Sequence, residues 1–232
     1  MLEAPVILHY TLLMKLFSEI TGSGMPLLLL HGNGEDHTIF NESARILSEH
    51  FTVYAIDSRG HGKSPAESVF HYSDMAEDII ELIHDHALVK PYIYGFSDGG
   101  IIALLAAMAE PDLPKAIAVS GANLSPSGLG FGSRLAMKLQ YLFTRNPLLK
   151  LMLCEPHITP EMLSRIQVPT LVLAGEHDLI REKETRMIAS SIKDSELMII
   201  PNEDHSSYIV HSTKIANILI GNWCRGKGEQ DD

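Results

Sequence analysis

The chain is poor in the residues that mark several protein classes. Its 232 residues include 2 cysteines and 1 tryptophan. The cysteines, Cys154 and Cys224, are too far apart for a metal knuckle and too few for a disulfide framework, which predicts free thiols in a reducing compartment. No apolar run reaches the roughly 18 residues of a membrane-spanning helix. We therefore expect no membrane span, no bound metal and a cytoplasmic location.

Positive charge is also scarce. The chain has 18 Lys and Arg against 29 Asp and Glu, a formal net charge of −11. Nucleic-acid binding needs a basic stripe, so no nucleic-acid partner is expected. The same balance argues against docking on an anionic membrane. The first twenty residues are apolar but have no basic start, which argues against a signal peptide.

Short apolar runs alternate with helical patterns along the chain. Several runs are apolar throughout, as in parallel strands that are buried on both faces. This alternation predicts an α/β fold with a mostly parallel central sheet flanked by helices. The expected strands are residues 14–20, 26–32, 51–57, 91–96, 116–122, 169–176 and 195–202. The expected helices include one capped by Ser73 and those over 99–110, 182–192 and 207–224.

One insertion interrupts the alternation. A loop rich in Gly, Ser and Pro follows residue 122, and helical patterns then continue to about residue 166, the third capped by Thr159. An insertion of this size favours a helical lid over 123–166. Its Leu, Met and Phe residues would cover an active site or, alternatively, form a surface for a partner or a lipid. We predict one domain over 14–224, an N-terminal extension over 1–13 and a flexible tail over 225–232.

The stretch "YIYGFSDGG" places Ser97 at G-x-S-x-G spacing. This pattern fixes only three residues and occurs by chance in about one chain of this length in ten. The sequence around it must therefore decide whether Ser97 is a nucleophile. Here the motif joins a predicted strand to a predicted helix, which is the setting of a nucleophile elbow. Glycines beside Ser97 relieve crowding at a strained turn. The alternative is a serine that caps a helix.

A nucleophilic serine needs a base and an acid, and both follow in the chain. Asp178 comes after the strand 169–176 and His205 after the strand 195–202. Their order and their places at strand ends match a Ser-His-Asp triad. The alternatives are His157, His177 or His211 as base, and Glu176 or Asp204 as acid. The N–H groups of Asn33 and Asp98 are the expected oxyanion donors, and His31 is expected to pack beneath their loop.

Together these stretches resemble the α/β-hydrolase superfamily, in its small single-domain esterase and lipase-like branch. "HGNG", "DSRGHGKS", "GFSDGG", "GEHD" and "EDH" stand in the superfamily's order, and the resemblance covers roughly residues 14–223. It implies a structural turn from Asp57 to Ser64. The N-terminal hairpin is shorter, and the lid smaller, than in many relatives.

The resemblance implies a serine hydrolase that cleaves small carboxylic esters through an acyl-enzyme, without a cofactor, as a monomer or weak homodimer. Thioester, amide, C–C and perhydrolase chemistry on the same triad remain alternatives, as does a non-catalytic small-molecule binding protein. Asp98 adds a further one, because some amino-acid-ester hydrolases of the superfamily resemble "SDGG". Its carboxylate would then bind a substrate ammonium, whereas otherwise it only favours the helix dipole.

Overall fold

A seven-stranded sheet forms the centre of the molecule in the computed structural model, which describes residues 15–224. The strand order is β1-β3-β2-β4-β5-β6-β7, and all pairs are parallel except β1 with β3. The strands are β1 (Ser18–Gly22), β2 (Met25–Leu30), β3 (Phe51–Ile56), β4 (Tyr92–Phe96), β5 (Ala116–Ser120), β6 (Thr170–His177) and β7 (Ser195–Asp204). The predicted α/β architecture is confirmed.

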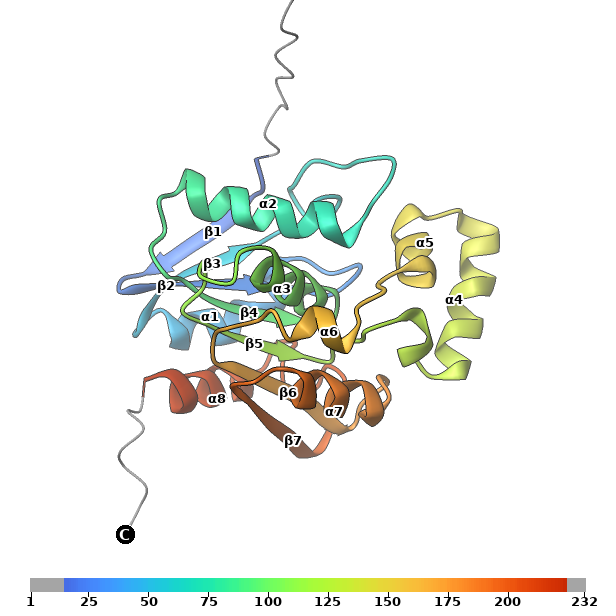
Figure 1. The fold of residues 1–232 in the computed structure, drawn as a ribbon. Helices are drawn as coiled ribbons and strands as arrows, with labels where there is room; N and C mark the ends of the chain where they lie inside the picture. The colour runs from blue at the N-terminus through green and yellow to red at the C-terminus, as the bar shows by residue number, and fades with distance from the viewer. Residues whose placement is uncertain (1–14, 225–232) are drawn as a thin grey trace, which may run out of the picture.

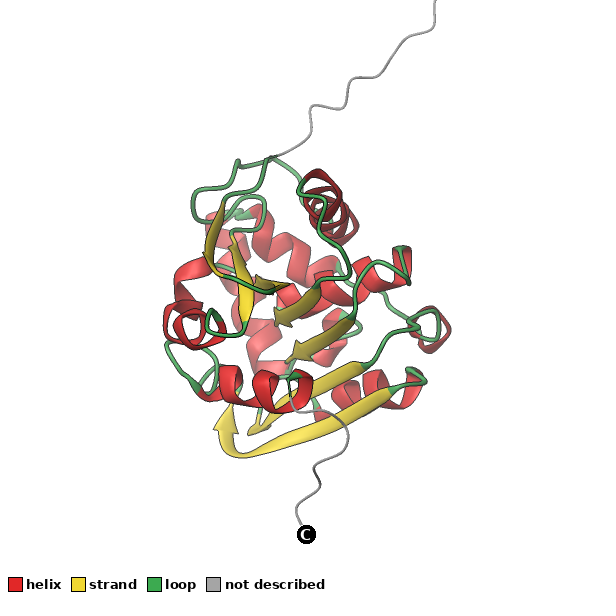
Figure 2. Cartoon of the chain, turned by 90° about the vertical axis from the view of Figure 1, so that its left-hand side faces the viewer, coloured by secondary structure: helices red, strands yellow, loops and turns green. Residues whose placement is uncertain are grey.

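Helices cover both faces of this sheet (Figures 1 and 2). One face packs against α2 (Tyr72–Asp85), α3 (Asp98–Ala109), α6 (Pro160–Leu163) and α7 (Glu182–Ser191). The opposite face packs against the 3₁₀ turn η1 (His37–Phe40), α1 (Asn41–Leu47) and α8 (Lys214–Trp223). The central strands β4 and β5 are buried along their whole length, which explains their continuous apolar sequence.

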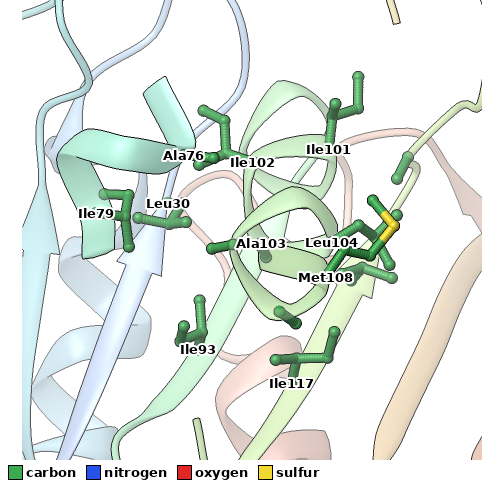
Figure 3. Packing of buried hydrophobic residues seen from close by; sticks show 14 of the residues in the cluster. Leu30, Ala76, Ile79, Ile93, Ile101, Ile102, Ala103, Leu104, Met108 and Ile117 are labelled. Atoms are coloured by element: carbon green, nitrogen blue, oxygen red, sulfur yellow. The ribbon is translucent and has the colours of Figure 1, made fainter. Parts of the chain in front are cut away.

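Helix α3 lies at the centre of the larger core. Its side chains fill the space between α2 and the strands β2, β4 and β5 (Figure 3). Ten of its twelve residues are buried, so it has almost no polar face. A helix buried this completely holds its N-terminus rigidly, and Ser97 is the residue that precedes it.

Several predicted boundaries were wrong, and tertiary contacts explain two of them. Helix α2 begins at Tyr72, not after Ser73, because the Glu155 carboxylate accepts the Tyr72 N–H at 3.1 Å and replaces a local cap. The first strand is Ser18–Gly22 rather than 14–20, since these residues pair with Thr52 to Ile56 of β3. The last helix begins at Lys214, and turns occupy most of 206–212.

The insertion after β5 is helical, as predicted. It contains the 3₁₀ turn η2 (Pro126–Gly128), α4 (Phe131–Thr144), α5 (Pro147–Cys154) and α6, whose first turn is capped by the Thr159 hydroxyl. Helices α4 and α5 stand beyond the edge of the sheet (Figure 1). In the described part of the chain, no helix has the length and apolar character needed to cross a membrane. The predicted extension 1–13 and tail 225–232 lie outside the described residues.

Asp57 organises the turn after β3, where the resemblance implied a structural role. Its buried carboxylate accepts the backbone N–H of His37 at 2.7 Å and of Lys63 at 2.8 Å, and it also contacts His37 Nδ1 at 2.7 Å. Burial raises the pKa of Asp57, but these hydrogen bonds outweigh burial and leave the pKa below its ordinary value. The carboxylate therefore stabilises the folded chain in its ionised form.

Replacing Asp57 by asparagine should lower the free energy of unfolding at neutral pH by about 2–4 kcal/mol, because an amide NH₂ would face a backbone donor. Because the pKa of Asp57 is lower in the folded state, its carboxylate stabilises the fold fully at pH values above the pKa of the unfolded state, near 3.9. This stabilisation is lost as the pH falls through the pKa of the folded state. Urea unfolding between pH 7 and pH 3 should therefore show the two proteins converging in acid. Exposed Asp194→Asn is the control, and a constant difference across this range would contradict the role of ionised Asp57.

Candidate active site

Ser97 lies on a strained turn between β4 and α3. Its backbone has φ 53° and ψ −115°, a region that residues other than glycine rarely adopt. Two neighbouring glycines make this turn possible. A Cβ at Gly95 would lie 2.1 Å from the Gly99 carbonyl oxygen, and one at Gly99 would lie 2.2 Å from that of Leu30. The Ser97 side chain makes no capping hydrogen bond, so the turn has the strained form expected of a nucleophile elbow rather than the form of an ordinary helix cap.

His205 and Asp178 meet Ser97 at the carboxyl edge of the sheet. His205 Nδ1 lies 2.7 Å from Asp178 Oδ1, and His205 Nε2 lies 3.2 Å from Ser97 Oγ. With Nδ1–H donating to the carboxylate, Nε2 is left to accept the serine proton. Asp178 is buried, and its Oδ1 also accepts the Ile180 N–H at 2.8 Å. The structure thus brings together three residues that lie far apart in the sequence.

Within the described residues, none of the alternative bases and acids hydrogen-bonds the side chain of Ser97 or His205. His211 contacts Glu42, and among the described residues neither His157 nor His177 has a side-chain hydrogen bond. The Asp204 carboxylate accepts N–H groups of the turn that follows it, and Glu176 accepts the Asn202 N–H. Within 15–224, only His205 hydrogen-bonds the Ser97 hydroxyl.

In the loop that follows β2, the N–H groups on both sides of Asn33 are engaged within the protein. Gly32 donates to Glu35 Oε2 at 2.9 Å, Gly34 to His61 Nε2 at 3.0 Å, and Glu35 to the Gly32 carbonyl at 3.4 Å. Within the described chain, the Asn33 N–H has no acceptor. The Asp98 N–H, the first of α3, also has none. The two predicted oxyanion donors therefore have no acceptor within the described residues.

His31 packs beneath this loop, as predicted. Its Nε2 accepts the Ser58 N–H at 3.0 Å, so Nδ1–H donates to the Gly32 carbonyl at 2.7 Å. Burial lowers the pKa of His31 to about 4, which keeps the imidazole neutral and both hydrogen bonds intact at neutral pH.

The Asp98 carboxylate faces the protein. It accepts the Asn33 amide at 2.9 Å and the hydroxyl of Tyr72, and it is buried. Burial raises the pKa of Asp98, and the hydrogen bonds from Asn33 and Tyr72 oppose that rise. The Asn33–Asp98 bond joins the side chains of the two residues whose N–H groups are free, and so holds the two donors in a fixed relation.

The sequence analysis missed two residues of this site. A methyl group at Gly32 would lie 2.8 Å from Glu35 Oε2 and 3.2 Å from Ser97 Cβ, so the Glu35 carboxyl flanks the serine. Burial raises the pKa of Glu35, against the Gly32 N–H bond that lowers it. At Gly121, with φ +60°, a Cβ would lie 2.6 Å from His205 Cε1, so only glycine admits the imidazole. Glu35 lies in the loop after β2 and Gly121 directly after β5, but no sequence pattern predicted that either residue contacts the site.

One group among the described residues has metal-ligand spacing, namely Asp36, His37 and Asp57. Protein donors already occupy its carboxylates. Asp57 accepts the bonds given above, and Asp36 Oδ1 accepts the Thr38 N–H at 2.9 Å. These contacts explain the group as part of the turn that begins η1.

The chain is similar to known hydrolases. The family model described as the alpha/beta hydrolase fold matches residues 25–151. Serine hydrolase BPHL of Homo sapiens is 30% identical, over 84% of this chain and 78% of its own length. A pimeloyl-[acyl-carrier protein] methyl ester esterase of Chromobacterium violaceum is 35% identical, but only over 46% of this chain and 40% of its own.

Solved structures agree on the fold. A thermophilic esterase from Thermogutta terrifontis superposes with a TM-score of 0.76 at 23% identity, covering 91% of this chain and 93% of its own. A bromoperoxidase from Bacillus anthracis superposes with a TM-score of 0.79 at 18% identity, and the match covers 89% of this chain and 94% of the bromoperoxidase chain. Such low identities support the fold alone. The family match over more than half of the chain shows that this protein belongs to the α/β-hydrolase family.

Proposed function

We propose that the chain is a serine esterase that hydrolyses small carboxylic esters through an acyl-enzyme. The observation that carries the proposal is the hydrogen-bonded series Ser97, His205 and Asp178, which ends beside two free N–H groups. The family and the esterases among the relatives support an ester as substrate.

In the proposed mechanism, Ser97 Oγ attacks the acyl carbonyl while His205 Nε2 takes its proton. Asp178 stabilises the imidazolium that forms. The carbonyl oxygen becomes an oxyanion, which accepts hydrogen bonds from the N–H groups of Asn33 and Asp98. His205 then gives its proton to the leaving alcohol. A water molecule, deprotonated by His205, attacks the acyl-enzyme and releases the acid.

The test is turnover of p-nitrophenyl esters with acyl chains from acetate to dodecanoate. Release of nitrophenolate would support the proposal, and the dependence on acyl length would measure the room beneath the insertion. An inert protein would instead favour amide, thioester or C–C substrates, or a binding protein on the same fold, since leaving-group preference depends on the pocket rather than on the triad.

A second candidate function is the hydrolysis of amino-acid esters. The Glu35 carboxyl flanks Ser97 and the Asp98 carboxyl belongs to the next residue, and within the described residues neither forms an ion pair with Lys or Arg. A site with this charge favours a positively charged substrate. Glu35 Oε1 accepts no hydrogen bond from the described chain, so it is open to an ammonium group, whereas Asp98 already accepts Asn33 and Tyr72.

For this second function, Asp98→Ala should raise KM for L-alanine benzyl ester about tenfold more than KM for benzyl isobutyrate, its neutral isostere. The reason is that the negative charge of Asp98 would attract only the ammonium substrate, whereas loss of its contacts with Asn33 and Tyr72 would affect both esters alike. Asp98→Asn is the matched variant, because it keeps the size of the side chain without the charge. Equal changes in KM for both esters would show that Asp98 acts on the protein rather than on a substrate cation.

A further inference from the structure

Helix α4 presents an apolar face that the rest of the described chain does not cover. The helix has no buried residue. Phe131 is 74% exposed and Phe143 is 87% exposed, and Leu135, Leu139 and Leu142 are also exposed. We call these five residues the lid face. Large apolar side chains gathered in one patch usually mark an interaction site.

The lid face points away from the body of the molecule. At 3.6 residues per turn, its five residues fall within an arc of about 120°. Met137 and Tyr141, which are partly buried, lie outside this arc. They belong to the side of α4 that packs on α5, the only element with which α4 has extensive contact among the described residues. In Figure 1, α4 is accordingly the outermost helix at the edge of the molecule.

The charge around the lid face differs from that of the whole protein. From residue 113 to residue 154 the sequence has no Asp or Glu, although the net charge of the chain is −11. Arg134, Lys138, Arg145 and Lys150 fall on α4 and α5 or between them. Within the described residues none of these four forms an ion pair. Arg134, Lys138 and Arg145 lie along one edge of the apolar arc.

We propose that the lid face docks on an anionic lipid surface. An apolar arc of Phe and Leu, edged by Arg and Lys, is the composition of helices that lie in a membrane interface. The face is a single convex helix, and a fluid lipid surface can accommodate a convex apolar face without a matching groove. The net charge of the chain argued against such docking. At physiological salt, however, charges more than about 8 Å from the lipid are largely screened. The lipid therefore interacts mainly with the four cations on and between α4 and α5.

Docking in this way would orient the candidate site toward the lipid. The insertion leaves the sheet at the end of β5, which is the parallel neighbour of the strand that leads into Ser97. The insertion and Ser97 therefore share one edge of the sheet. For the substrate, this inference rests on the proposed function: docking would bring esters that partition into a lipid surface to the edge of the sheet that carries Ser97. Binding itself does not depend on catalysis.

The experiment is sedimentation of the full chain with vesicles of phosphatidylcholine alone or mixed with phosphatidylglycerol. We expect binding to the anionic vesicles at least about tenfold tighter than to the neutral ones, and weaker binding at high salt. The double variant Leu139→Ser/Phe143→Ser should lower anionic binding at least about tenfold, because it removes apolar area from the contact. Lys138→Glu/Arg145→Glu should abolish the preference for anionic vesicles.

Matched controls separate this face from the rest of the surface. Val89→Ser removes an apolar side chain that is 75% exposed in the loop after α2, and Lys193→Glu reverses an exposed charge after α7. Both should bind vesicles like the wild type. The proposal is overturned if the wild type binds neither vesicle, or if the controls lose as much binding as the lid-face variants. It is also overturned if light scattering shows a dimer or a complex with an acidic protein that buries the lid face and excludes vesicles. Ester turnover by the wild type is measured separately, so failure of docking would leave the proposed function standing.

Discussion

Replacing Ser97 by alanine should lower kcat for p-nitrophenyl acetate by about 10⁴–10⁶-fold. The variant loses the only hydroxyl within the described residues that hydrogen-bonds His205 Nε2, and with it the acyl-enzyme route. The fold should be retained, since the Ser97 N–H bond to the Ser120 carbonyl at 2.8 Å does not involve the side chain. Activity that remains would come from substrate binding and the oxyanion donors.

The control for this measurement is Ser207→Ala, a change in an exposed, hydrogen-bonded serine near His205 in the sequence. It should keep kcat within about threefold of the wild type, as expected for a substitution outside the reacting groups. If Ser97→Ala keeps most of the activity, the nucleophile lies elsewhere. If wild type and variant are equally inert toward the whole ester series, the ester proposal fails and amide, thioester and binding functions become the better explanations.

Replacing Asp178 by asparagine should lower kcat by about 10³–10⁴-fold with a small change in KM. The asparagine oxygen can take the place of Oδ1, which accepts both the Ile180 N–H and the His205 Nδ1–H. A neutral amide, however, does not stabilise the imidazolium that forms when His205 takes the proton of Ser97. The expected loss is therefore a loss of electrostatic stabilisation rather than of structure.

Two variants of the rival acids test this assignment. Glu176→Gln and Asp204→Asn change carboxylates close in sequence to Asp178 and His205, and both hydrogen-bond backbone N–H groups rather than an imidazole. Each should keep kcat within about tenfold of the wild type. A loss as large as that of Asp178→Asn in either one would move the acid role to that residue.

Much of the fold could be predicted because burial on both faces of a sheet leaves a local signature. The runs "PLLLLHG" and "PYIYGF" are apolar without alternation, and both are buried strands. Ser73 shows where local patterns fail. It has the residue type of a helix cap, but the N-terminus of α2 is satisfied by Glu155, which lies 83 positions away from Tyr72. No local pattern contains a contact of that separation.

The candidate site, like the fold, could be predicted from the sequence only in part. By itself the sequence determined the order of Ser97, Asp178 and His205 and their places after strands, because strand ends in a parallel sheet share one edge. Only the tertiary structure decided which histidine reaches the serine, which N–H groups lack acceptors, that Glu35 flanks Ser97 and that Gly121 must admit the imidazole. It also decided that the apolar side of α4 faces outward. Side-chain periodicity shows that a helix has an apolar face, but the direction of that face depends on how distant segments pack.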